Sequence, residues 1–306
     1  MNKITITLYR NGETDFMRRN LVTIFMSLFL IIFLVACQSG NEEVNDKNNE
    51  NNNEQNEVDE NKNEKENNEN NDVNNDSNND NEETNTNDDT AALFQQIFES
   101  RDNVEIYDMD MGMDILINSP GGRDTSSLAV IGKIDEKNDE GNIELIEKNA
   151  NGETFQHAVF YDGAQYVSDG EIWQDNGTPL PAGSLKSSGT TYYNIIEAVR
   201  DFGEHAEVEE KDNKYIATYS GPAKDIFYIF QDVYNLSLTG ADLETETTVE
   251  VEAIFQKDTL FMEELLINIS ADADAGKIKF DIWNEFKDFN DTKIDIPKDL
   301  KKELDL

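Results

Sequence analysis

The chain of 306 residues carries 65 acidic and 25 basic side chains, which gives a formal net charge of −40. A field of this sign repels phosphate backbones, so the composition excludes nucleic acid as a partner. One cysteine cannot form an intramolecular disulfide, and two histidines are too few for a typical zinc site, so any metal would have to be bound by oxygen ligands alone; we expect no metal and no cofactor.

An apolar segment, Leu21–Ala36, closely follows Met17 and the basic pair Arg18 and Arg19. A positive region followed by an apolar region and small residues is the pattern of a secretory signal peptide. This segment is also shorter than the roughly 20 residues of a membrane span. We therefore expect residues 1–36 to be a signal peptide. Because the stretch before Met17 has no signal character, we also expect translation to start at Met17.

The single cysteine, Cys37, ends the apolar segment in the tetrapeptide LVAC, which resembles the bacterial lipobox. The resemblance implies that Cys37 receives a diacylglyceryl group and becomes the mature N-terminus, on the outer face of the cell membrane. Two acyl chains hold a protein stably in a bilayer, where one is only marginal. The alternative is a plain transmembrane anchor that contains a cysteine.

Asparagine, aspartate and glutamate dominate residues 37–90. Such a segment buries too little apolar surface to offset the entropy of ordering, so we expect a disordered tether, extended by its own negative charge. It would lift a folded domain off the membrane; an interaction tail for a cationic partner is the alternative. The same composition suggests an AT-rich genome and a Gram-positive host.

The composition becomes globular from residue 91. Asp89 and Thr90 are expected to cap a short amphipathic helix that carries Phe94 and Ile97, and residues 104–118 alternate between apolar and polar with period two. That alternation predicts a long strand with one apolar face. Further strands, separated by Asn-Gly and Asp-Gly turns, are expected at 126–135, 141–149, 153–163, 164–170 and 171–176.

The second half continues the pattern. A helix is expected at 190–203, ended by Gly203, and another opens at Pro222. The remaining segments are expected as hairpins at 205–221 and 246–271, closing strands at 276–290 and 292–297, and a short helix at 298–304. Strands outnumber helices and no βαβ alternation occurs, so we expect one α+β domain, a curved, unclosed antiparallel sheet packed over helices.

The motifs of catalysis are missing from the chain. It contains no GxSxG, no GxxxxGK[ST] and no HExxH, and His157 lies in the middle of a predicted strand. Asp108, Asp110 and Asp114 superficially resemble a calcium loop, but strand alternation explains their spacing without a metal. We therefore expect a protein that is not an enzyme and that has no metal site.

Methionine recurs on one face of the long predicted strand. Methionine is flexible and polarisable, and it suits surfaces that accept varied apolar ligands, although plain core packing explains the pattern as well. The candidate lining of an apolar cavity consists of Met109, Met111, Met113, Ile115, Trp173 and Trp283.

Two segments, VFYDGAQYVSDGEIWQ and FKDFNDTKIDIPKDLKKEL, together with the lipobox and the polar spacer, resemble uncharacterised Gram-positive lipoproteins related to the LolA/LppX-like superfamily. The resemblance covers residues 91–306. It implies a half-barrel sheet with helices on its concave side and a cavity that carries lipid or acyl chains. It carries over no individual ligand residue.

Together these features predict a membrane-anchored lipoprotein that binds an apolar ligand such as a lipid. An interaction or sensory module with a filled core, recruiting another envelope protein, is the second interpretation. An enzymatic interpretation would require a pocket with converging carboxylates.

Overall fold

The computed structural model describes residues 86–306, apart from 176–178, 187–188 and 275. The expected signal peptide, the lipidated Cys37 and almost all of the expected tether lie outside the described residues. The first described element is the helix α2 (Thr86–Ser100), which begins five residues before the expected start of the folded domain. Asp89 and Thr90 therefore lie inside the helix and do not cap it.

Eleven antiparallel strands form one sheet in the order β6-β5-β4-β3-β2-β1-β11-β10-β9-β8-β7. The edge strands β6 and β7 do not pair with each other, so the sheet is unclosed, as expected. The strands are β1 (Ile106–Ser119), β2 (Gly122–Asp135), β3 (Glu140–Asn149), β4 (Gly152–Tyr161), β5 (Ala164–Ser168), β6 (Trp173–Asp175), β7 (Glu207–Lys211), β8 (Lys214–Pro222), β9 (Thr247–Gln256), β10 (Met262–Ala273) and β11 (Gly276–Lys287).

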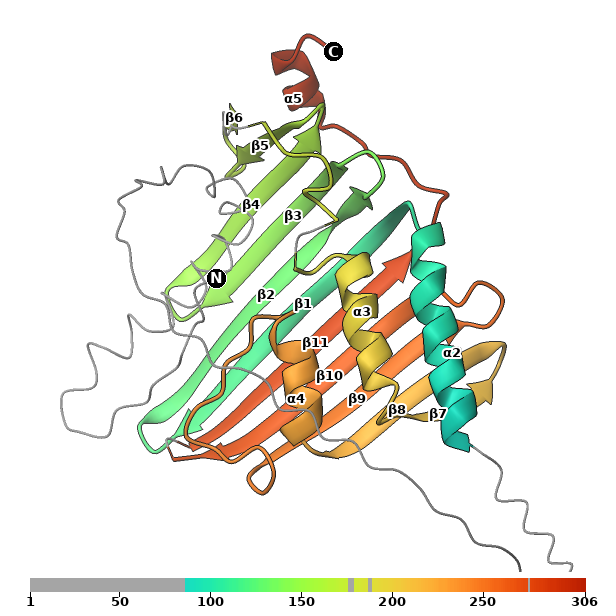
Figure 1. Ribbon diagram of the computed structural model, residues 1–306. Coiled ribbons are helices and arrows are strands. Elements are labelled where there is room, and N and C mark those ends of the chain that lie inside the picture. The colour runs from blue at the N-terminus through green and yellow to red at the C-terminus, as the bar shows by residue number, and fades with distance from the viewer. Residues whose placement is uncertain (1–85, 176–178, 187–188, 275) are drawn as a thin grey trace, which may run out of the picture. The chain divides into compact units, whose positions relative to one another are not determined.

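Three helices lie against one face of this sheet, over the half that contains β7–β11 (Figure 1). They are α2, α3 (Tyr192–Phe202) and α4 (Lys224–Gln231), and a 3-10 turn, η1 (Arg101–Asn103), joins α2 to β1. We call the face beneath these helices the inner face and the opposite face the outer face. A last helix, α5 (Lys298–Glu303), lies at the β6 end of the sheet (Figure 1).

The core lies between the inner face and the helices. Phe94 of α2 packs edge-on against Phe202 of α3 and Phe255 of β9, with ring centroids 6.2 and 6.0 Å apart. A Cβ at Gly203 would collide with the Phe94 ring. Gly203 ends α3, as the sequence predicted, but its φ of −56° is right-handed, so the close approach of α2 and not a left-handed backbone requires a glycine here.

Two other expectations about the second half are wrong. Pro222 ends β8, and α4 begins two residues later, at Lys224. Residues 292–297 form no strand; this segment is held by side chains, since the Lys133 Nζ donates to Thr292 Oγ1 (2.9 Å) and the Asn142 Nδ2 donates to the Asp295 carbonyl (2.5 Å).

Candidate functional site

The inner face is filled where the helices cover it. Met109, Met111 and Met113 lie on this face of β1 and are only 3, 5 and 8% exposed. Their partners on β11 include Phe286 opposite Met109 and Ile282 opposite Met113, both buried. The three methionines therefore belong to the hydrophobic core.

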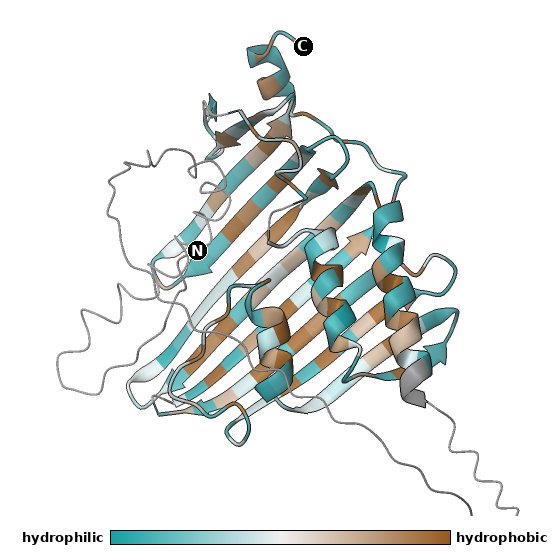
Figure 2. Ribbon diagram, viewed as in Figure 1, coloured by the Kyte–Doolittle hydropathy of each residue, from teal (hydrophilic) through white to brown (hydrophobic). Residues whose placement is uncertain are grey.

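The inner-face side chains of β1 become more exposed in the part of the strand that extends beyond the helices. Ile115 and Ile117 continue the alternation, and both are half-buried. Figure 2 shows apolar bands on β1–β4 in the half of the sheet that the helices leave free. We define the inner strip as five apolar inner-face side chains of this region: Ile115, Ile117 and Ala158, which are half-buried, and Leu128 and Leu145, which are buried as part of the core on which the other three lie.

Polar groups border the inner strip. Glu147 of β3 lies opposite Leu128, and its Oε1 accepts a hydrogen bond from the Asn149 Nδ2 at 3.1 Å. Burial raises the pKa of the Glu147 carboxyl above its ordinary value, although the bond from Asn149 opposes the shift. Gln156 faces Leu145 from β4. An apolar surface with a polar border suits a molecule that has an apolar chain and a polar end.

The two tryptophans do not line this surface. Trp283 lies opposite Gly112 and Trp173 opposite Ser168, and both of these partners belong to the outer row. The side chains therefore point away from Met109 and Ile115, and their assignment to an inner cavity is wrong. Strand alternation places adjacent residues on opposite faces, and Trp283 is one residue out of phase with the inner Ile282.

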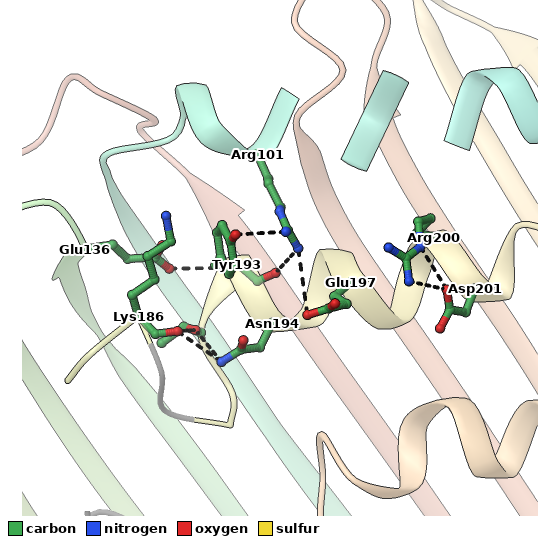
Figure 3. Close-up of polar contacts among 9 residues, drawn as sticks. Arg101, Glu136, Lys186, Tyr193, Asn194, Glu197, Arg200 and Asp201 are labelled. Atoms are coloured by element: carbon green, nitrogen blue, oxygen red, sulfur yellow. Dashed lines mark hydrogen bonds and ion pairs between the residues drawn. The ribbon is translucent and has the colours of Figure 1, made fainter. Parts of the chain in front are cut away.

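A polar cluster fixes the start of α3, as Figure 3 shows. The guanidinium of Arg101 lies between the rings of Phe98 and Tyr193, 3.7 Å from each centroid, and donates to the Tyr193 hydroxyl at 2.8 Å. Behind it, buried Glu136 accepts from the Tyr107 hydroxyl at 2.8 Å. Burial raises the pKa of the Glu136 carboxyl. The cluster joins η1, the end of β2 and α3, and nothing in the sequence pattern pointed to it.

Other polar candidates have structural partners, although the Asp108 Oδ1 is buried without a hydrogen bond among the described residues. His157 Nε2 lies 2.5 Å from the Asn142 Oδ1, and its ring packs 4.9 Å from that of Trp173. Asp108 pairs with Lys133 at 3.4 Å. Among the described residues no group of three or more His, Cys, Asp or Glu side chains could hold a metal ion. Within residues 86–306, no helix has the length and apolar character needed to cross a membrane.

No family model matches the chain, and no curated protein matches its sequence. Among solved structures, the chain is similar to the lipoprotein LppX of Mycobacterium tuberculosis, with 11% identity and a TM-score of 0.35 over 68% of this chain and 98% of that one. For LprF of Mycobacterium bovis the identity is 7% and the TM-score 0.35, over 69% and 97%. For a LolA superfamily protein of Nitrosomonas europaea they are 14% and 0.20, over 67% and 96%.

An LppX lipoprotein and a LolA superfamily protein, of the kind that the sequence resembles, are thus among the solved structures to which this chain is similar. At these identities and TM-scores the likenesses carry over neither a ligand nor a site residue, and the function has to be argued from the residues of this chain.

Proposed function

We propose that this protein is a non-enzymatic lipoprotein, anchored to the outer face of the cell membrane, that binds an apolar ligand such as a lipid chain on the inner strip. One observation carries the proposal. The inner row of β1 continues as isoleucine beyond the helices, and there Ile115 and Ile117 are half-buried where Met109 and Met111 are buried. Apolar side chains are thus left partly in water on a face that the rest of the fold uses as its core.

The energetics favour a long apolar ligand. Removing a methylene group from water stabilises the bound state by about 0.8 kcal/mol, so an acyl chain that covers the inner strip gains affinity with its length. The Glu147 carboxyl, whose pKa is raised by burial, would face the polar end of such a molecule. No chemical step is needed, because water rejects the chain and the sheet accepts it.

The anchor is supported by sequence alone. Cys37 follows the apolar segment directly, and the acidic segment after it contains no apolar run. Metabolic labelling with an alkyne fatty acid tests it: the wild-type protein should take up the label and the Cys37→Ser variant should not. Equal labelling of the two proteins would exclude lipidation at Cys37.

Ligand binding is tested on the chain that carries Cys37→Ser, by solvent extraction with mass spectrometry and by titration with a fluorescent fatty acid. We expect Ile115→Asn to weaken binding about tenfold, because it places an amide on the inner strip. Leu116→Asn is the matched control, since Leu116 is the next residue of β1, is also half-buried and faces outward. Absence of co-purified lipid together with absence of fatty-acid binding would reject the proposal.

The filled core beneath the helices favours a second candidate function, an interaction module of the cell envelope that recruits another protein. Met109, Met111 and Met113 leave no open surface under the helices. For this function the recognition surface would lie elsewhere on the domain.

A further inference from the structure

The outer face carries an apolar stripe that crosses six strands. In the register of the sheet, Leu266 of β10 lies opposite Trp283 of β11, and Trp283 lies opposite Gly112 of β1. Gly112 in turn faces Ala129 of β2. The row continues through Ile146 of β3 to Phe155 of β4, and Ile131 is the next outward-facing residue of β2. We define the outer stripe as Leu266, Trp283, Ala129, Ile131, Ile146 and Phe155.

The outer stripe is partly open to solvent, most of all at Ile131 and Phe155. Phe155 is 38% and Ile131 44% exposed, and Trp283, Leu266 and Ile146 are half-buried. The described helices α2, α3 and α4 all lie on the inner face (Figure 1). Isolated apolar side chains on a surface are ordinary, but a continuous row of them marks an interaction site.

The C-terminal segment covers a neighbouring part of the outer face and reaches Trp173, whose Nε1 donates to the Asp299 carboxylate at 2.7 Å. It is held there by Lys133 and Asn142, which bond to Thr292 and to the Asp295 carbonyl. Lys133 is the next outward-facing residue of β2 after Ile131, and Asn142 is the outward-facing residue of β3 just before Glu144. Both lie on the side of these residues that is away from Phe155. The segment therefore borders the outer stripe without occupying it.

A row of carboxylates runs beside the outer stripe. Glu264 of β10 lies opposite Glu285 of β11, and Glu285 lies opposite Asp110 of β1. Among the ion pairs of the described residues, none neutralises these three side chains. Burial, followed by the neighbouring carboxylates of Glu285 and Glu252, raises the pKa of Glu264, and the charge of Lys214 opposes this rise. We call Glu264, Glu285 and Asp110 the acid row.

The nearest lysines on the other side of the stripe are already paired. Lys279 lies 2.7 Å from Asp281, and Lys148 lies 3.0 Å from Glu153. Like charges directly opposite each other in a sheet are unfavourable, so the acid row gains stability from any cation that binds beside it. The outer stripe thus presents an apolar band with a negative edge, in which three carboxylates stand side by side while the flanking lysines, Lys287 opposite Asp108 and Lys214 near Glu264, form no ion pair with them among the described residues.

We propose that the outer stripe and the acid row form a docking surface for a cationic amphipathic segment of a partner protein. The apolar side of such a segment would cover Trp283, Phe155 and Ile131, and its lysine or arginine side chains would reach the acid row. A second copy of this chain carries the same net charge of −40, and an anionic phospholipid surface is negative too, so both are repelled. This surface is separate from the inner strip, and the proposal does not depend on the proposed ligand.

The probe is a synthetic amphipathic helix of lysine and leucine, labelled and titrated by fluorescence anisotropy against the full chain that carries Cys37→Ser, at physiological ionic strength. We expect saturable binding. A scrambled peptide of the same composition has the same charge but no apolar side, and a glutamate–leucine helix has the opposite charge; both should bind at least about tenfold more weakly.

Two pairs of variants locate the binding. The double variant Ile131→Ser, Phe155→Ser shortens the outer stripe, and we expect about tenfold weaker binding, as for the loss of apolar anchors at an interface. Its matched control is Ile172→Ser, Tyr228→Ser, which removes two exposed apolar side chains that lie outside the stripe. The double variant Glu264→Gln, Glu285→Gln should also weaken binding, whereas Glu204→Gln, Asp225→Asn removes the same charge from exposed positions near the helices.

Three results would overturn the proposal. Binding that falls equally in the controls and in the stripe variants would be non-specific attraction to a negative protein. Equal binding of the scrambled helix would show that the stripe takes no part. Self-association of the chain that Phe155→Ser abolishes, measured by analytical ultracentrifugation, would assign the surface to a second copy. Circular dichroism confirms that each variant is folded.

Discussion

Gly112 of β1 lies directly opposite Trp283 of β11, and the indole of Trp283 lies where a Cβ at position 112 would stand. The same Cβ would collide with the carbonyl oxygen of Leu128 on the other side. The indole nitrogen then lies 3.5 Å from Asp110 Oδ1, within the acid row. A glycine in the middle of β1, one of the two longest strands, thus provides the space for the central side chain of the outer stripe.

Gly112→Ala should destabilise the domain by about 1–3 kcal/mol, because the strand has to shift and the indole has to move outward. Denaturant midpoints measure the loss, and fluorescence in a Trp173→Phe background reports the displacement of Trp283. Gly141→Ala is the control, since a Cβ at Gly141 would meet its nearest neighbours at 3.4–3.5 Å, an ordinary contact. If both substitutions cost the same, packing against Trp283 does not explain the glycine.

The alternation of apolar and polar residues predicted most of the fold. It predicted β1 and its row of methionines. In β11 the same alternation also indicates which face Trp283 occupies. Phe280, Ile282 and Phe286 share one face, and Trp283 is out of phase with all three. Trp283 was predicted to line the cavity because of its residue type, whereas its position in the alternation places it on the outer face. Trp173 lies in a strand of three residues, which is too short to show a phase.

The failures have a common physical cause in long-range packing. The sequence predicted a strand at 292–297, but this segment is held by Lys133 and Asn142, which are far away in sequence. How far the helices extend over the sheet likewise depends on contacts such as Phe94 with Phe255, which no local pattern reports. The boundary between the filled core and the inner strip therefore emerged only from the structure.

Tyr234 and Asn284 form a polar pair inside the core. The Asn284 Nδ2 lies 2.7 Å from the Tyr234 hydroxyl, both side chains are buried, and the Asn284 Oδ1 has no partner among the described residues. Tyr234→Phe should destabilise by about 1–3 kcal/mol, because it leaves the amide with less compensation for its burial. The double variant Tyr234→Phe, Asn284→Leu should recover part of this loss in a double-mutant cycle. Strictly additive losses would contradict an interaction between the two side chains.

Arg101 is stabilised by its two rings more than by its ion pair. Glu197, its charged partner, is 3.9 Å away and exposed, and such a pair contributes little. Arg101→Lys should therefore lower the free energy of unfolding by about 1–3 kcal/mol. An ammonium reproduces neither the stacking on Phe98 and Tyr193 nor the hydrogen bond to the Tyr193 hydroxyl. Glu197→Gln should change the unfolding free energy by less than about 0.5 kcal/mol. A larger loss in Glu197→Gln than in Arg101→Lys would reverse this assignment.

Glu136 makes the stability of the domain depend on pH. Burial is the largest cause of its raised pKa, and the hydrogen bond from Tyr107 opposes the rise. A carboxyl whose pKa is higher in the folded than in the unfolded state binds its proton more tightly when folded. Its contribution to stability is therefore complete below the unfolded pKa and is lost as pH rises through the folded pKa.

Urea unfolding midpoints measured from mildly acidic to neutral pH test this contribution. Glu136→Gln has no proton to release, so its midpoint should gain on that of the wild type as pH rises. Tyr107→Phe removes a hydrogen bond that favours the ionised Glu136 carboxyl, so the pKa of Glu136 should rise further. In this variant the loss of stability with rising pH should therefore extend to higher pH than in the wild type. A constant difference between Glu136→Gln and the wild type across the whole range would show that the Glu136 carboxyl keeps the same pKa on folding.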